Sequence, residues 1–367
     1  MGWKGFKKAE GVLLVGLLAC WLSSSTASFA GEWVNPKDVF GDSRLARLQN
    51  GKTELTETEK QEIVRYGYTG LELMTYLYAN LHPGRDYTNY HRCVNVSSTK
   101  NFRVADILIR AKYNYKDVKD RTKYEEIKPG DIEYKRVSLL LTPAESRGAT
   151  SLSFYYLRGP KKNRDMDSWR WTRNTRKTTR GTPRTLQQEQ GSMITSRGDD
   201  QGREPWEEEH RIIGEDVITV YGKKYDCLLV ESKHHNPNYY LSRRVTWVER
   251  NNFLDAHEEQ FNRKRKLFKV FDKDWFQVEP NQFWVSRETN IIKLPSMRRT
   301  IHQTPLWRVD EGLRDDYFTR RMLGRQSVWM EIEGVLPPVN SYADLSPEPK
   351  VRWEFWQKVG VEVAVAK

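Results

Sequence analysis

VSLLLTPAESRGATSLSFYYL occupies Val137–Leu157 and opens the longest run of β-type sequence in this chain of 367 residues. Leu152, Phe154 and Tyr156 stand at every second position within it, which is the period of a half-buried strand. The same alternation returns in EDVITVYGKKYDCLLVESK, residues 215–233. These stretches predict a β-sheet at the centre of the fold.

Two turn signals divide the later part of this run. Tyr221-Gly222-Lys223-Lys224 lies between two apolar segments and predicts a hairpin, and Asn251-Asn252 can adopt left-handed turn conformations. Further short strands are predicted at residues 266–271, 275–278, 283–286 and 299–304. Because the connections are short and show no helical pattern, the simplest arrangement is an antiparallel sheet in a mainly β (α+β) fold.

A helical region precedes the strands. Thr56 with Glu59 is a capping box, and apolar residues then recur at helical spacing, which predicts one helix ending near Asn80. The strands are expected to start at about Ile132. The predicted division of the chain is a signal peptide (1–30), a helical lead region (31–130), the β domain (131–325) and a C-terminal tail (326–367).

The first 30 residues have the features of an export signal. Basic residues come first, the apolar run 11–22 is too short to span a membrane comfortably, and Ser28-Phe29-Ala30 is a cleavage site of the small-x-small type. We therefore expect a periplasmic protein cleaved after Ala30. Two alternatives remain open, a lipoprotein anchored at Cys20 and an uncleaved anchor.

Export bears on the partners and on the cysteines. The formal net charge is +12, yet a periplasmic location makes nucleic acid an unsuitable partner and leaves anionic lipid or protein surfaces. Cys93 and Cys227 could pair in an oxidising compartment, or remain as free buried thiols.

A basic stretch is the candidate for docking on an anionic surface, either lipid head groups or an exporter. Its residues are Arg170, Arg173, Arg176, Lys177, Arg180 and Arg184. The alternative is a solvated strand face. Residues 174–211 contain few apolar side chains and predict a long loop, either a gate or docking element or simply a solvated connection.

Enzyme motifs are missing from the sequence: it has no G-x-S-x-G, no H-E-x-x-H and no glycine-rich phosphate loop. Polar groups suited to a metal occur at Glu231, His234 and His235, with His257 and Glu258 further on. Adjacent histidines on a strand point to opposite faces, so they are poor joint ligands. No catalytic residue, metal site or cofactor is predicted.

The order of several weak motifs resembles the LolA-like superfamily of outer-membrane lipoprotein-sorting proteins, in the branch associated with RND-type exporters. The motifs are LTPAESRGATSLSFYYL, the tryptophan pair WRW, the basic RNTRKTTR, VYGKKYDCLLVESK, VTWVER, DAHEEQF and DDYFTRRML. They cover about Ile132 to Leu323. The long N-terminal region, the 174–211 loop and the tail after Leu323 depart from the compact family pattern.

The resemblance implies a strongly curved antiparallel sheet, an unclosed half-barrel covered by helices, whose apolar cavity takes an acyl chain. The implied function is a non-enzymatic periplasmic carrier or accessory protein that binds a lipid or lipoprotein acyl chain, with an inner-membrane RND-type exporter as partner. The expected lining residues are Leu152, Phe154, Tyr156, Val217, Leu228, Val230, Trp247 and Phe268. Each of them could instead be ordinary core. The alternative function is a structural or assembly protein of the cell envelope that docks through basic loops.

Overall fold

The computed structural model describes residues 54–81, 84–114, 131–156, 166–181, 193–195, 199, 204–279, 282–325 and 336–366. Ala30 and Cys20 lie outside these residues, so the export signal and both processing alternatives stay predictions. Within the described part of the chain, no helix is both long enough and apolar enough to cross a membrane.

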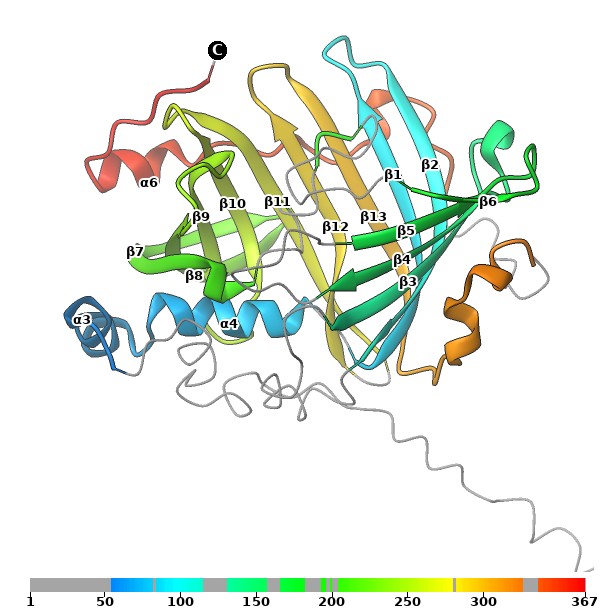
Figure 1. Ribbon diagram of the computed structural model, residues 1–367. Coiled ribbons are helices and arrows are strands. Elements are labelled where there is room, and N and C mark those ends of the chain that lie inside the picture. The colour runs from blue at the N-terminus through cyan, green and yellow to red at the C-terminus, as the bar shows by residue number, and fades with distance from the viewer. Residues whose placement is uncertain are drawn as a thin grey trace, which may run out of the picture. The chain divides into compact units, whose positions relative to one another are not determined.

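One 13-stranded antiparallel sheet dominates the structure (Figure 1). Its strands are β1 (Asp86–Val96), β2 (Phe102–Tyr113), β3 (Ile132–Leu140), β4 (Thr150–Tyr156), β5 (Met166–Trp171), β6 (Thr178–Arg180), β7 (Glu208–Val220), β8 (Lys223–His234), β9 (Leu241–Glu249), β10 (Asp255–Asn262), β11 (Leu267–Val278), β12 (Phe283–Lys293) and β13 (Arg298–Val309). The strand order is β6-β5-β4-β3-β2-β1-β13-β12-β11-β10-β9-β8-β7. The sheet is an unclosed half-barrel, because β6 and β7 end it without pairing with each other, and this confirms the predicted fold class.

The sheet begins earlier in the chain than predicted. β1 and β2 lie in the region expected to be a helical lead, and β1 pairs with β13 while β2 pairs with β3. The expectation that strands start near Ile132 is therefore wrong. The later strands are also longer than predicted, since β11 continues through both 266–271 and 275–278. Within the 174–211 segment, β6 near its start and the first residues of β7 at its end are strands, although both were expected to be loop.

Two helices replace the single helix predicted before the sheet. The capping box of Thr56 and Glu59 is confirmed at the start of α3 (Glu57–Tyr66), but Gly67 then adopts a left-handed conformation and ends the helix. A second capping box, Thr69 with Glu72, starts α4 (Gly70–Asn80). A further helix, α6 (Trp353–Lys358), lies near the C-terminus.

The two predicted turns have different outcomes. Tyr221 and Gly222 both have positive φ, as expected of the hairpin joining β7 and β8. In the turn from β9 to β10 the positive φ falls on Phe253 rather than on Asn251 or Asn252. The carboxylate of Glu249 accepts hydrogen bonds from the backbone N–H groups of both asparagines, which fixes the turn by another route.

The open edge at β7 is covered by α3. Glu62 of α3 accepts a hydrogen bond from the backbone N–H of Ile212 in β7 (2.6 Å) and a second from the N–H of Gly70 (2.9 Å). Burial raises the pKa of the Glu62 carboxyl, and these two hydrogen bonds oppose that rise. A β carbon at Gly70 would meet the Arg211 backbone nitrogen at 2.8 Å, so only glycine allows this close approach.

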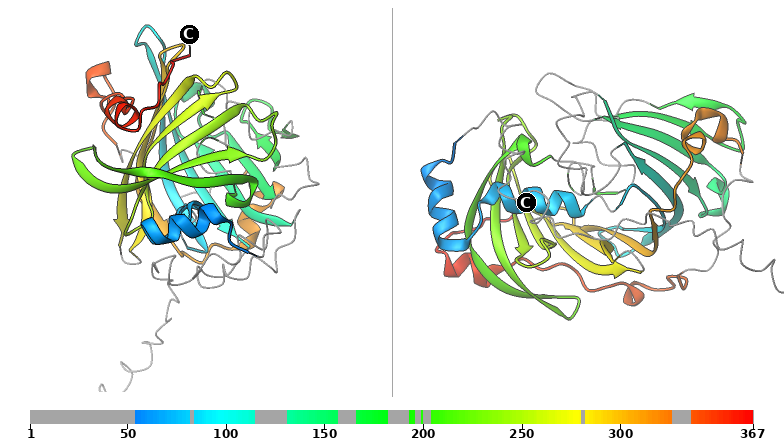
Figure 2. Two further views of the ribbon diagram at one scale, coloured as in Figure 1. Left: turned by 90° about the vertical axis from the view of Figure 1, so that its left-hand side faces the viewer. Right: turned by 90° about the horizontal axis from the view of Figure 1, so that it is seen from below.

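Different parts of the chain cover the two faces of the sheet (Figure 2). We call the face that carries α4 the inner face, because α4 lies within the curve of the sheet. The outer face carries α6 and the C-terminal segment 336–366. Two clusters of buried apolar residues anchor that segment, one around Trp247, Phe355 and Trp356 and the other around Val94, Ile301 and Leu345.

Candidate functional site

The inner face holds the largest apolar cluster of the described structure, directly beneath α4. All 11 residues of α4 are buried. Apolar side chains of α4 belong to one buried cluster with side chains from β1, β2, β7, β8, β9, β12 and β13. We call these strand residues the inner apolar cluster: Tyr87, Ile109, Ile212, Leu228, Val230, Val248, Phe283 and Val309. Hydrogen bonds add to these contacts, among them those from Asn80 to the carbonyl oxygen of Asn252 (2.6 Å) and from the Tyr78 hydroxyl to Glu133 (2.6 Å). Apolar burial and these hydrogen bonds together hold α4 in place.

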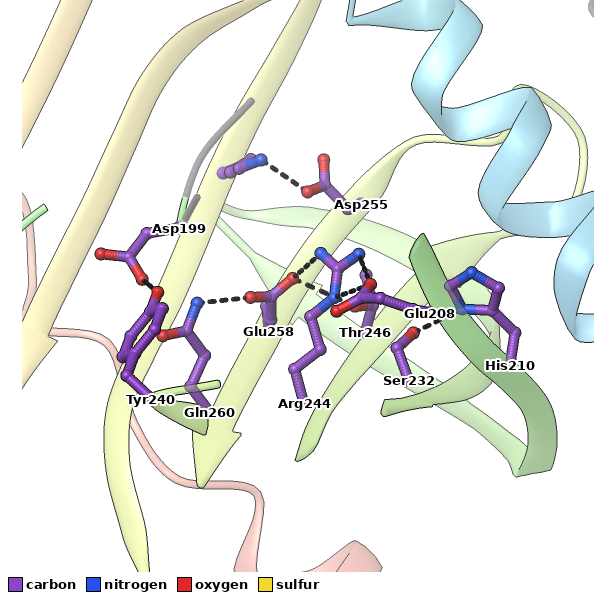
Figure 3. Close-up of polar contacts among 11 residues, drawn as sticks. Asp199, Glu208, His210, Ser232, Tyr240, Arg244, Thr246, Asp255, Glu258 and Gln260 are labelled. Atoms are coloured by element: carbon purple, nitrogen blue, oxygen red, sulfur yellow. Dashed lines mark hydrogen bonds and ion pairs between the residues drawn. The ribbon is translucent and has the colours of Figure 1, made fainter. Parts of the chain in front are cut away.

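A buried polar network continues the inner face beyond this cluster (Figure 3). Arg244 of β9 donates to Glu208 of β7 (2.6 Å) and to Glu258 of β10 (3.1 Å). Thr246 also donates to Glu258, and the Gln260 amide does the same (2.8 Å). The charged members are at most 10% exposed, so each charge depends on its partners rather than on water.

His210 and Ser232 form a pair at the edge of this network. The Ser232 hydroxyl donates to Nδ1 of His210 (2.8 Å), because Nε2 must donate to the carbonyl oxygen of Pro205 (2.7 Å). Burial lowers the pKa of His210 to about 4, so the ring is neutral at pH 7. Ser232 is 1% exposed, and it lines neither the cavity of the inner face described below nor a second cavity between α3 and β7. The pair is therefore placed to support the fold.

The segment between β6 and β7 reaches the inner face at two described points. Ile194 packs against Phe271 and Ile291 with no exposed surface. Asp199 pairs with Lys269 of β11 (2.7 Å), and both side chains are buried. The Tyr240 hydroxyl donates to Asp199 as well. This part of the predicted loop is thus anchored against β11 and β12 rather than solvated.

A cavity of about 160 Å³ lies between the inner apolar cluster and β13. We call it the arginine cavity. Its lining residues are Tyr87, Asn89, His91, Cys93, Ile107, Ile109, Tyr134, Arg136, Tyr155, Met193, Thr195, Ser286, Thr289, His302, Thr304 and Trp307. At about 30 Å³ for each water, the space equals roughly five waters. Ligand pockets usually measure about 300–1,000 Å³, so this cavity suits a small polar group better than a whole acyl chain.

Aromatic rings and two histidines shape the arginine cavity. Tyr134 and Tyr155 stack at 4.2 Å between ring centroids. Nε2 of His91 and Nδ1 of His302 are 2.9 Å apart, so one of them must donate a proton to the other. Burial, His302 and Arg136 together hold the pKa of His91 well below its usual value. His91 is therefore neutral, and Arg136 is the permanent charge of this cavity.

The predicted lining residues are spread over both faces of the sheet. Leu228 and Val230 belong to the inner apolar cluster. Leu152 and Phe154 pack with Leu313, Phe318 and Leu323, and Trp247 packs under α6. The Tyr156 hydroxyl donates to Asp167, Val217 is 54% exposed, and the amines of Lys269 and Lys293 lie over the ring of Phe268. The eight side chains do not form one lining, because both faces of the sheet are covered and each alternating strand places apolar residues on one or the other.

The predicted basic stretch lies on the β5–β6 hairpin at the far edge of the sheet. Arg170, Arg173, Arg176, Lys177 and Arg180 are all exposed, while Arg184 lies outside the described residues. Only Arg180 has an ion pair with a described carboxylate, that of Asp167 at 3.0 Å.

The polar residues considered for a metal site are not brought together. Glu231 binds Arg211 and Arg243, and the ring of His234 stacks on Tyr239. His257 is buried between Asp272 and Glu259, whereas its neighbour Glu258 points to the opposite face and binds Arg244. His235 follows at the end of β8. No group of His, Cys, Asp or Glu in the described part of the chain could hold a metal ion.

Cys93 and Cys227 are both free and buried. Cys93 lines the arginine cavity, whereas Cys227 packs on the outer face near Trp247. Because the two thiols lie on opposite faces of the sheet, the pairing alternative fails for this fold.

The sequence reading missed the buried charges of the inner face. Strand alternation places Arg136, Arg244 and Glu258 on the same face as inner-face neighbours. Because these side chains are charged, however, they were expected to face the solvent. A signal was present, since Arg244-x-Thr246 and Glu258-x-Gln260 each repeat polar residues at period 2 along a strand.

Comparisons with known proteins agree with this fold. A family model with the description "Uncharacterized protein" matches residues 133–325, more than half of the chain. The chain belongs to this family. The match covers almost the same residues as the predicted β domain, although the sheet also includes β1 and β2. A search among curated proteins gave no match.

Solved structures share the architecture. A DUF1329 family protein from Desulfovibrio piger is 18% identical, with a TM-score of 0.56 over 73% of this chain and 100% of that chain. A Vibrio parahaemolyticus domain, assigned by its description to outer membrane lipoprotein sorting, is 15% identical, with a TM-score of 0.55 over 70% of this chain and 98% of its own. A LolA superfamily protein from Nitrosomonas europaea is 13% identical and covers 69% of this chain and 98% of its own, with a TM-score of 0.46. The predicted resemblance to LolA-like lipoprotein-sorting proteins is confirmed for the fold.

Proposed function

We propose that the protein is a periplasmic carrier or accessory protein that holds the acyl chain of a lipid or lipoprotein against the inner apolar cluster. The observation that carries the proposal is α4, a helix with every residue buried, lying over the apolar end of the inner face. Each methylene moved from water to such a surface contributes about 0.8 kcal/mol, so a long acyl chain could replace the apolar contacts of α4. The LolA-like fold supports the same function.

Binding in this way requires α4 to move. The arginine cavity alone is smaller than an acyl chain needs, whereas displacement of α4 would join it to the surface beneath the helix. Gly67 separates α3 from α4 in a left-handed conformation, and this position is a natural hinge. α3 can then remain on β7 through the hydrogen bond between Glu62 and Ile212, while the bond from Gly70 to Glu62 breaks as α4 swings away.

Lipid analysis of the purified protein tests this proposal. Mass spectrometry of an organic extract should show acyl lipid in stoichiometric amount, and delipidated protein should take up a fluorescent fatty acid. Ile107→Trp adds bulk beside the cavity and should reduce uptake. Phe154→Trp is the matched control, because Phe154 is similarly half-buried but packs on Trp169 in a different cluster. Protein that neither carries lipid nor takes up the probe would refute the proposal.

The partner of this carrier is an inner-membrane RND-type exporter, with transfer of the cargo toward the outer membrane. The exposed cations of the β5–β6 hairpin supply a docking surface for the exporter or for anionic head groups. Replacing Arg170, Arg173 and Lys177 by Glu should weaken binding to anionic vesicles, and added salt should weaken wild-type binding. If neither changes, the hairpin is only a solvated surface.

A second function is favoured by the filling of the inner face. The network around Arg244, together with Ile194 and Asp199, occupies much of the space that a carrier would leave open. This observation fits a structural or assembly protein of the cell envelope that docks through its basic hairpin. Such a protein would bind the exporter or the membrane normally while containing no lipid, and the lipid analysis separates the two functions.

A further inference from the structure

The arginine cavity has an unusual charge balance. None of the described residues that line it is an aspartate or a glutamate, while Arg136 points its positive charge among tyrosines. Arg136 is partly buried and lines the cavity together with Tyr87, Tyr134 and Tyr155, and it forms no ion pair with a carboxylate of the described residues. A cation removed from water without a counter-charge is unfavourable unless something else supplies that charge.

Three fully buried cations of the inner face show the contrast with the partly buried Arg136. Arg244 lies between two carboxylates, and Lys269 and Lys273 each bind an aspartate. Arg136 differs from all three because it faces a cavity. The missing counter-charge is therefore expected inside that cavity.

Two further polar groups lack partners at the same place. The side-chain amide oxygen of Asn89 and the indole N–H of Trp307 are buried without a hydrogen-bond partner in the described structure. Both residues line the arginine cavity, and Asn89 is 3% exposed. A ligand with acceptor oxygens for Arg136 and Trp307 and a hydroxyl group for Asn89 would satisfy all three.

We propose that the arginine cavity binds the phosphate ester head group of an amphiphile, with Arg136 as its counter-charge. The proposal rests on the proposed carrier function and names the class of its cargo: phospholipid-type amphiphiles with a hydroxylated head group. Guanidinium groups bind phosphate oxygens in a bidentate manner, and a cavity of about 160 Å³ has room for a glycerophosphate group but not for its acyl chain. The acyl chain would then lie along the inner apolar cluster, which shares Tyr87 and Ile109 with the cavity wall.

The test compares two lipids of one chain length on delipidated full-length protein. Lysophosphatidylglycerol carries the phosphate ester, and monoacylglycerol lacks it. Wild-type protein should bind the phosphate lipid at least tenfold more tightly, and Arg136→Gln should abolish that preference while leaving the monoacylglycerol affinity unchanged. Lys135→Gln is the matched control, because the neighbouring side chain lies on the other face and pairs with Asp315; it should change neither affinity.

Glycerol 3-phosphate and inorganic phosphate form the remaining arms. Competition by glycerol 3-phosphate would support head-group recognition, and competition by phosphate alone at equal concentration would show that the site takes the free ion. Equal binding of both lipids by wild-type protein would overturn the inference while leaving the carrier function intact. Conversely, Arg136-dependent binding of glycerol 3-phosphate without any lipid binding would overturn the carrier function and support the anion site. Should Arg136→Gln not fold, Arg136→Lys keeps the charge without the bidentate geometry and should still lower the lipid preference.

Discussion

Replacing Arg244 by Met should destabilise the protein far more than an equivalent change at the surface. Arg244 donates to Glu208 and Glu258, and all three side chains are at most 10% exposed. Removing one partner of a buried ion pair typically costs about 3–5 kcal/mol, because the remaining charge stays buried without compensation. Met fills a similar volume, so little of the effect should come from a cavity.

The expected shift in melting temperature follows from the size of the chain. Unfolding entropy is roughly 2.1 cal/mol/K per residue, or about 0.8 kcal/mol/K for a chain of this length. A loss of about 3–5 kcal/mol therefore corresponds to a decrease in melting temperature of about 4–6 °C, measurable by calorimetry or by circular dichroism.

Arg250 provides the matched control. It also bridges two carboxylates, those of Glu215 and Asp226, but both are more than half exposed. Exposed ion pairs contribute only about 0–1 kcal/mol, so Arg250→Met should lower the melting temperature by no more than about 1–2 °C. Equal shifts for Arg244→Met and Arg250→Met would refute the view that the inner network depends on burial.

Four further expectations follow from the described contacts. His210 has a folded-state pKa of about 4, below its unfolded value, so it lowers stability as the pH falls from about 6.5; His210→Gln should flatten this acid limb by up to about 3 kcal/mol in a pH series of urea melts. Burial opposes charge on His257, yet hydrogen bonds to Asp272 and Glu259 raise its pKa overall. The protonated ring therefore stabilises the fold at low pH, and this stabilisation is lost as the pH rises through the folded pKa. His257→Gln should remove that loss of stability with rising pH in the same series of urea melts. Leu228→Arg should unfold the protein or lower its melting temperature by several degrees because Leu228 is fully buried beneath α4, whereas Val217→Arg, 54% exposed, should be tolerated; a folded Leu228→Arg protein would show that the inner cluster is not packed. Thr69→Ala removes the capping box of α4 and should cost about 1 kcal/mol by chemical denaturation, and an unchanged midpoint would contradict the role of that cap.

Much of the sheet could be predicted from sequence because several of its strands alternate apolar and polar residues. The hairpin at Tyr221-Gly222 and the antiparallel sheet follow from local pattern, whereas the half-barrel was implied only by the family resemblance. β1 and β2 were harder to predict: their sequences, DYTNYHRCVNV and FRVADILIRAKY, mix charge with apolar residues because Arg92 and Asp106 form an ion pair under the C-terminal segment. Charge that is neutralised by a distant residue looks like exposed charge in a sequence.

The candidate site was harder to predict for the same reason. Period-2 alternation assigns Leu152 and Leu228 each to a face of its own strand but cannot relate faces across strands separated by bulges. The pairing records several such shifts, for example between Asp255 and His257. Arg136 can be recognised as a cavity residue only from the tertiary structure, in which β1, β3 and β13 surround one cavity. Contacts between segments more than a hundred residues apart decide which side chains share that space.

The hydrogen bond from Ile212 to Glu62 has a consequence for how the chain behaves among other chains. An open sheet ends in strands whose N–H and C=O groups can pair with a neighbouring molecule, and β7 is the long strand at one end of this sheet. α3 occupies that edge, and Glu62 occupies one of its N–H groups. At the opposite end, β6 has only three residues and all are exposed. Such a sheet offers little template for strand addition, so an α3-deleted chain, with the full β7 edge open, is the form in which self-association into strand-linked polymers would begin.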